Sequence, residues 1–152
     1  MPDLKDPVFM HYAIAAALGV LKVMGQGWVT VLRMLRHGGG YASPEDLRPG
    51  VINRAPDARQ LEPHEAVERS RRMHRNDLEN IPAFWIAGLL FALTSPPLWL
   101  ALLLIYGFVL ARAGHAWAYA TSRSHEIRAT FYTLASLAVI CMALWVLAAV
   151  LV

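Results

Sequence analysis

The sequence predicts an all-α membrane protein in which four transmembrane helices form a bundle. Composition is the first observation behind this prediction: 57% of the 152 residues are hydrophobic and 16% are charged, whereas about a quarter are charged in soluble domains. The mean hydropathy is +0.40. The second observation is that apolar segments near the roughly 20 residues needed to cross a bilayer recur along the chain. We expect a single membrane domain over residues 1–152, with spans at 9–36, 64–93, 97–120 and 128–151 and a cytoplasmic loop at 37–63.

The first span is apolar over residues 9–32 except for Lys22. An ionised side chain at membrane depth is costly unless it is paired. We therefore expect Lys22 to form a structural ion pair, with Glu79 and Asp77 as the candidate acids. The span ends near Arg36, where three consecutive glycines follow His37.

The connection over residues 37–63 contains four prolines and reads as a loop. Ser43 followed by Pro44 and two acids is typical of a helix start, so we expect a short helix there. A loop of this length in a compact protein is usually functional or disordered. We expect this one to act as a lid over a site.

The second span joins a charged segment directly to an apolar one. Its apolar part, residues 81–93, is too short to cross a bilayer alone, so the charged residues before it must complete the helix. Pro82 should kink this helix. The third span is interrupted by Arg112 and His115, and the fourth has no charged residue after Arg128.

Orientation follows from the basic residues of the loops. Those of the first loop and the third connection are Arg33, Arg36, Arg48, Arg54, Arg59, Arg123 and Arg128. By the positive-inside rule both connections should be cytoplasmic and both termini should lie on the opposite side. The isoelectric point near 9.4 reflects this bias. We expect no nucleic-acid partner.

One face of the second span concentrates polar groups. Arg72, Arg75, Asn76 and Glu79 follow helical spacing, with Glu68 one turn earlier. Arginines bind carboxylates bidentately and a glutamate accepts from an ammonium group, so this stripe can bind a small zwitterion. The alternative is that these charges only neutralise one another between helices.

Two further polar sets lie at the cytoplasmic ends of their helices. Arg112, His115 and Tyr119 share a face of the third span, and Arg128 and Tyr132 share a face of the fourth. The sets can converge with the second-span stripe at one depth. Taken singly, His115 fits a packing histidine, the tyrosines fit an interfacial aromatic belt and Arg128 fits a membrane anchor.

Metal and haem sites are not expected. Bis-histidine haem ligation requires histidines facing each other at matched depths, and the six histidines do not provide such a pair. Cys141 is the only cysteine, which excludes an internal disulfide and a cysteine-based metal site. Thiol chemistry would need an imported thiol.

The motif Glu68-Arg69-x-x-Arg72-x-His74-x-Asn76-Asp77-x-Glu79-Asn80 resembles the signature of the MAPEG family, the membrane-associated proteins in eicosanoid and glutathione metabolism. The likeness extends to Pro44-Glu45-Asp46, to Arg112-x-x-His115-x-x-x-Tyr119 and to Arg128-x-x-x-Tyr132. It is greatest for the microsomal glutathione transferase and prostaglandin E synthase branches.

The resemblance implies a homotrimer that binds glutathione on its cytoplasmic side, between neighbouring protomers, and takes a lipophilic substrate from the bilayer. Either Arg33 or Arg36 would reach glutathione from the first helix. The other implied glutathione-binding residues are Arg72, Arg75, Asn76, Glu79, His115, Tyr119, Arg128 and Tyr132.

The resemblance also implies the catalytic roles. A guanidinium near sulfur lowers a thiol pKa from about 8.5 toward neutrality, and Arg128 is the expected source, with Tyr119 as a hydroxyl donor to sulfur. Asp46 occupies the position of an acid sometimes argued to be catalytic.

We expect a glutathione transferase or lipid-hydroperoxide peroxidase. Ala129 replaces a serine of the prostaglandin synthase branch, and Ser136 replaces a glutamine of its groove. A prostaglandin-H isomerase is the alternative within the family. Two further alternatives are a non-catalytic binding protein and a small transporter.

Overall fold

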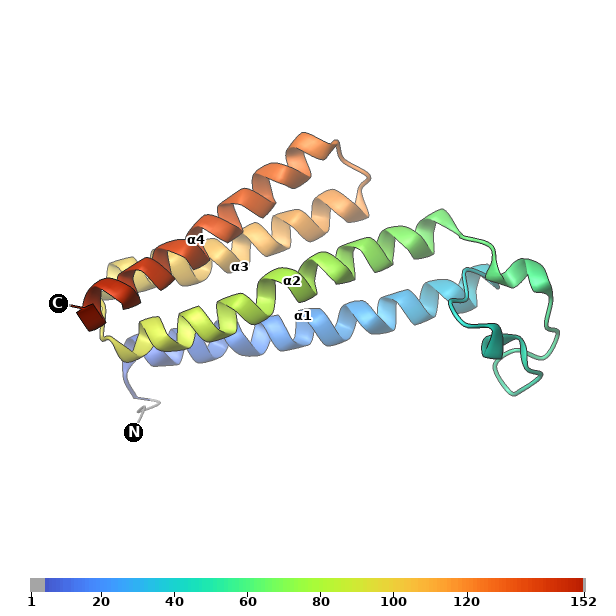
Figure 1. Cartoon of the computed structure of the whole chain (residues 1–152), viewed down its shortest axis with the longest axis horizontal. Helices are drawn as coiled ribbons and strands as arrows, with labels where there is room; N and C mark the ends of the chain where they lie inside the picture. The colour runs from blue at the N-terminus through green and yellow to red at the C-terminus, as the bar shows by residue number, and fades with distance from the viewer. Residues whose placement is uncertain (1–4, 152) are drawn as a thin grey trace. The chain divides into compact units, whose positions relative to one another are not determined.

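The computed structural model describes residues 5–151, and all of its regular secondary structure is helical (Figure 1). Helix α1 covers Pro7–His37, α2 covers Glu65–Leu93, α3 covers Leu98–Ala120 and α4 covers His125–Leu151. Within the described residues, three of these helices, α1, α3 and α4, are long and apolar enough to cross a membrane. Helix α2, which the sequence predicts as a fourth span, is not among them because its first half is charged.

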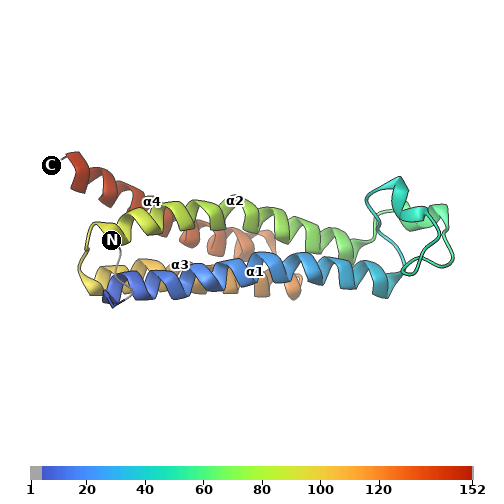
Figure 2. The ribbon, with the colours of Figure 1, turned by 90° about the horizontal axis from the view of Figure 1, so that it is seen from below.

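The chain divides into two compact units. Among the described residues, the first comprises residues 5–23 and 76–151, and the second comprises residues 24–75. Helices α1 and α2 each contribute one segment to each unit. Within each unit the local segments of α1 and α2 run beside each other, which Figures 1 and 2 both show.

The core of the first unit is aromatic and aliphatic. Phe84 of α2 stacks on Phe108 of α3 with ring centroids 4.2 Å apart, and both side chains are buried. The Tyr12 hydroxyl of α1 donates a 2.7 Å hydrogen bond to the Trp85 carbonyl. The Tyr12 hydroxyl thereby has a hydrogen-bond partner inside an apolar environment. Helix α2 continues through Pro82 without interruption.

Helices α3 and α4 form an antiparallel pair in the first unit, shown in Figure 1 in yellow and red tones. Gly114 permits their close approach, because a Cβ atom at this position would lie 2.4 Å from the Phe131 ring. The connection is short: α3 is capped at Thr121, and Ser122 takes a positive φ of 58°. The start of α4 is therefore held beside the end of α3.

The second unit holds the long loop. Gly38 and Gly40 both have positive φ, which glycine adopts without steric cost, and a Cβ at Gly40 would lie 3.1 Å from Val67. The short helix predicted after Ser43 is present as a 3-10 helix, η1, over Pro44–Leu47. A second 3-10 helix, η2, covers Ala58–Leu61 and was not predicted.

Candidate functional site

An ion triad occupies the interior of the first unit. Asp77 is fully buried, and its two carboxylate oxygens each lie 2.5 Å from a cation, Lys22 Nζ and Arg112 Nη2. The sequence left the partner of Lys22 open between Asp77 and Glu79, and the structure selects Asp77. The triad links α1, α2 and α3, and the contact of Arg112 with Asp77 is the part that sequence reasoning did not assign.

The predicted sets of α3 and α4 meet in the first unit. The His115 and Tyr119 rings lie 5.0 Å apart by centroids, and the Arg128 guanidinium carbon lies 4.8 Å from the Tyr119 ring centroid. A guanidinium at this distance over an aromatic face is held by a cation–π interaction. His115 is buried. These three residues therefore form one cluster at the junction of α3 and α4.

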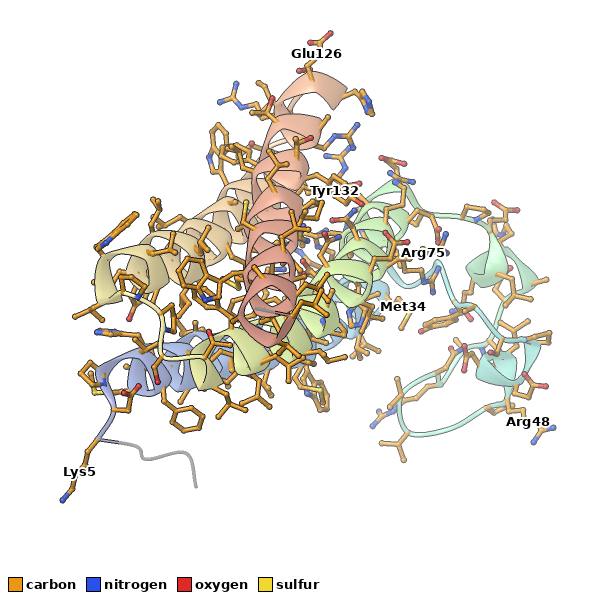
Figure 3. All side chains as sticks on the ribbon, turned by 60° about the vertical axis from the view of Figure 1, so that its left-hand side comes forward. Lys5, Met34, Arg48, Arg75, Glu126 and Tyr132 are labelled. Carbon is orange, nitrogen blue, oxygen red and sulfur yellow. The ribbon has the colours of Figure 1, made fainter. Side chains whose placement is uncertain are left out.

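Tyr132 belongs to the same helix as Arg128, one turn further along, and is 40% exposed. Figure 3 shows Tyr132 on α4, with Glu126 at the beginning of the helix. Tyr132 therefore presents its phenol at the surface of the first unit.

Asn76 and Glu79 contribute from α2. Glu79 is exposed, and Asn76 is half-buried. Asn80, which the motif also contains, donates a 2.9 Å hydrogen bond to the Asn76 carbonyl and accepts one of 3.5 Å from the Ser136 hydroxyl of α4. The second of these bonds connects α2 to α4 within the first unit.

Three predicted site residues of the first unit each have a buried polar atom without a hydrogen-bond partner among residues 5–151. These atoms are Asn76 Oδ1, His115 Nδ1 and Arg128 Nε. An unpaired buried polar atom costs about 1–3 kcal/mol, and native proteins pair the great majority of them. One acceptor, one ring nitrogen and one cationic donor are thus available to a polar ligand.

The charged half of α2 lies in the second unit. Glu65 accepts from Arg69 and Arg72 at 3.1 and 2.8 Å, whereas Glu68 pairs with Arg71. Arg72 and Glu65 are both exposed. Some of the charges do neutralise one another, but the partners lie one or two turns away on α2 itself, whereas the alternative interpretation placed them on different helices.

Arg75 is exposed, and no ion pair involves it within the described part of the chain. Figure 3 shows its position on α2.

The two first-helix candidates differ in their contacts. Arg33 donates a 3.0 Å hydrogen bond to the Ala66 carbonyl and so connects α1 to the beginning of α2. Arg36 is exposed at the end of α1. Arg33 already has a structural role in the second unit.

Asp46 is exposed and caps the first turn of η1, accepting from the Ser43 amide at 3.2 Å. It lines a cavity of about 450 Å³ together with Met34, Tyr41 and Ile52. Figure 3 shows Arg48, which also lines this cavity, at the edge of the loop. Asp46 therefore has a capping role in the second unit.

Comparisons with known proteins agree with the sequence motif. The MAPEG family model matches residues 12–148. Microsomal glutathione S-transferase 1 of Sus scrofa is 39% identical over 119 residues, which are 78% of this chain and 75% of that protein. The Homo sapiens protein of the same name is 36% identical over 127 residues, 83% of this chain and 80% of its own length. Prostaglandin E synthase of Homo sapiens is 32% identical over 145 residues, 95% of this chain and 91% of that protein. This chain belongs to the MAPEG family.

Proposed function

We propose that this protein is a glutathione-dependent membrane enzyme that activates glutathione as a thiolate. The thiolate would attack lipophilic electrophiles, reduce lipid hydroperoxides, or do both. Support comes from family membership, since two of its similar relatives are named as glutathione S-transferases. The observation that carries the proposal is the cluster of His115, Tyr119 and Arg128, with its unpaired buried donors.

The proposed glutathione contacts follow from charge and chemistry. Glutathione carries two carboxylates and one ammonium group. The guanidinium groups of Arg72 and Arg75 suit its carboxylates, and Glu79 suits its ammonium group. Asn76 and His115 offer buried polar atoms. The full proposed set is Arg33, Arg72, Arg75, Asn76, Glu79, His115, Tyr119, Arg128 and Tyr132.

The proposed chemistry begins with loss of the thiol proton to solvent. Arg128 stabilises the thiolate electrostatically, with Tyr119 donating to sulfur. In conjugation, sulfur forms a bond to the electrophilic carbon and a leaving group departs with its electron pair. In peroxide reduction, sulfur attacks the terminal oxygen, the O–O bond breaks and the alcohol leaves after protonation. A second glutathione then reduces the sulfenic acid, giving the disulfide and water.

We further propose a homotrimer in the membrane with the site facing the cytoplasm and the lipophilic substrate entering from the bilayer. The exposed apolar side chains of α3 and α4 are compatible with lipid or with a neighbouring protomer. Asp46 is proposed as an accessory acid. Its exposed position on the loop makes it accessible to a substrate.

Prostaglandin-H isomerisation is the second candidate. It is favoured by the alignment with prostaglandin E synthase, which covers more of this chain than the alignments with the transferases. Turnover of the prostaglandin endoperoxide that far exceeds turnover of a chlorodinitrobenzene electrophile would select this candidate. Turnover of neither substrate would select a non-catalytic binding protein.

The experiment that tests the proposal is a glutathione titration of the purified full chain in detergent, following thiolate absorbance in the ultraviolet. We expect a saturable thiolate signal in the wild type and its loss in Arg128→Ala. The matched control is Arg123→Ala, because Arg123 stacks over the Trp117 ring at 4.9 Å, much as Arg128 stacks over Tyr119. An equal signal in Arg128→Ala would remove this residue from the mechanism, and no signal in the wild type would overturn the proposal.

A further inference from the structure

The buried ion triad of the first unit carries an excess positive charge. Lys22 and Arg112 are two cations, and among the described residues 5–151 Asp77 is the one acid with which they form ion pairs. The side chains are 26%, 4% and 0% exposed in the order Lys22, Arg112 and Asp77. Each oxygen of the carboxylate is used by one cation. Because a buried net charge is costly, this site favours a bound anion.

Arg112 has hydrogen-bonding capacity that Asp77 does not use. A guanidinium carries five N–H donors, and the bond to Asp77 involves Nη2 alone. Its Nε and Nη1 atoms are buried and have no partner among the described residues 5–151. These donors are cationic, and an anionic oxygen is the acceptor that they bind most strongly.

Lys22 and Arg112 both line a cavity of about 160 Å³ in the first unit. Its other walls are apolar and include Leu18, Ile81, Phe108 and Val109. Leu18 is 46% exposed, so the cavity reaches the surface of the unit beside α1. Liquid water occupies about 30 Å³ per molecule, so this volume holds a small polar head and a few methylene groups.

We propose that this cavity binds the carboxylate end of a single-chain fatty acid that enters from the bilayer. The carboxylate balances the excess charge and accepts from Arg112, while the apolar walls contact the first methylene groups. The remainder of the chain extends into lipid. A bulky phospholipid headgroup exceeds the cavity volume, and a small inorganic anion would lose its hydration without contacting the apolar walls. This site is distinct from the proposed glutathione residues.

The test uses the purified full chain in phosphatidylcholine nanodiscs, with oleate labelled by carbon-13 at its carboxyl group as the probe. We expect a separate, saturable carboxyl resonance for bound oleate. Methyl oleate should not displace it, because the ester lacks the anionic charge. Chloride and acetate at equal concentrations should not displace it either, because neither contacts the apolar walls. Displacement by chloride or acetate would show a small-anion site and overturn the proposal.

Substitutions test separately how the positive charge and the shape of the cavity contribute to oleate binding. Lys22→Met removes the excess charge but leaves Asp77 paired with Arg112, so we expect unchanged helicity and oleate affinity lower by about tenfold or more. Lys22→Arg keeps the charge and should retain binding. Ala113→Leu adds bulk at a lining position and should also weaken binding.

The matched control is Leu110→Phe, at a position on the same helix that is 69% exposed and does not line this cavity. It should bind like the wild type. Equal oleate affinity in Lys22→Met and in the wild type would overturn the proposal, as would the absence of a saturable bound resonance in the wild type. If Lys22→Met fails to fold, Ala113→Leu decides: retained affinity in that variant would overturn the proposal.

Discussion

Replacing Asp77 with asparagine should destabilise the protein more than most single substitutions. The change removes one negative charge and leaves Lys22 and Arg112 facing a neutral amide in the interior of the first unit. Removing one partner of a buried ion pair costs about 3–5 kcal/mol. Although Asp77 has two cationic partners, we expect the free energy of unfolding to fall by this amount only once. Lys22 is 26% exposed, so its ammonium group can turn toward solvent. Arg112 is 4% exposed and cannot.

A loss of this size is large against the roughly 5–15 kcal/mol that stabilises a typical protein. The assay is reversible unfolding in mixed micelles with increasing dodecyl sulfate, followed by far-ultraviolet circular dichroism. Lys22→Met serves as the comparison, since it leaves Asp77 with Arg112, and it should cost less than Asp77→Asn.

A rescue experiment tests the electrostatic reason. Adding Lys22→Met and Arg112→Met to Asp77→Asn removes the two unbalanced cations, and replacing buried ionic groups with apolar side chains is often neutral or stabilising. We expect the triple variant to regain stability relative to Asp77→Asn. A cost below about 1 kcal/mol for Asp77→Asn, or no recovery in the triple variant, would refute the argument that this carboxylate compensates buried charge.

Two further predictions concern packing and the loop. Gly114→Ala should lower stability by about 1–3 kcal/mol, because the new Cβ meets the Phe131 ring. Gly107→Ala is the control on the same helix, since a Cβ at that position would meet nothing within 4 Å, and equal unfolding curves for the two variants would contradict the prediction. In the loop, hydrogen bonds from Arg59 lower the pKa of Asp57 from 3.8 to about 2. The stabilisation from this depressed pKa should be fully present above the ordinary value and lost as pH falls through about 2. A carboxyl carbon-13 titration of Asp57 with a midpoint near 3.8 would contradict it.

The positions of the helices could be predicted because their limits are set by local chemistry. Apolar length, the glycines after His37 and the prolines before Leu98 mark where α1 ends and α3 begins. Helix α4 starts at His125, before the expected span at 128, because a polar first turn extends a helix beyond its apolar part. The helix η2 was missed, although Asp57 followed by Gln60 three residues later is a capping-box pattern that indicates it.

The partners of charged residues could not be predicted from spacing alone. Asp77 and Glu79 are two residues apart, so they point about 200° apart around α2. Which of them meets Lys22 depends on the rotation of α2 against α1, and packing of the aromatic core sets that rotation. Periodicity did place His115 and Tyr119 on one face of α3. Their contact with Arg128 required the short turn and the small Gly114, which only the folded chain reveals.

Two adjacent arginines of α2, Arg71 and Arg72, differ in burial and in their hydrogen-bond and ion-pair partners. Arg71 is half-buried, pairs with Glu68 and donates a 2.6 Å hydrogen bond to the Gly40 carbonyl, so it holds the loop against the helix. Arg72 is exposed, and its ion-pair partner is the exposed Glu65. An exposed pair of this kind contributes about 0–1 kcal/mol, so a bound carboxylate can replace Glu65 at little cost. The acceptors around each guanidinium therefore distinguish Arg71, which has a structural role, from Arg72, which the proposed function assigns to glutathione.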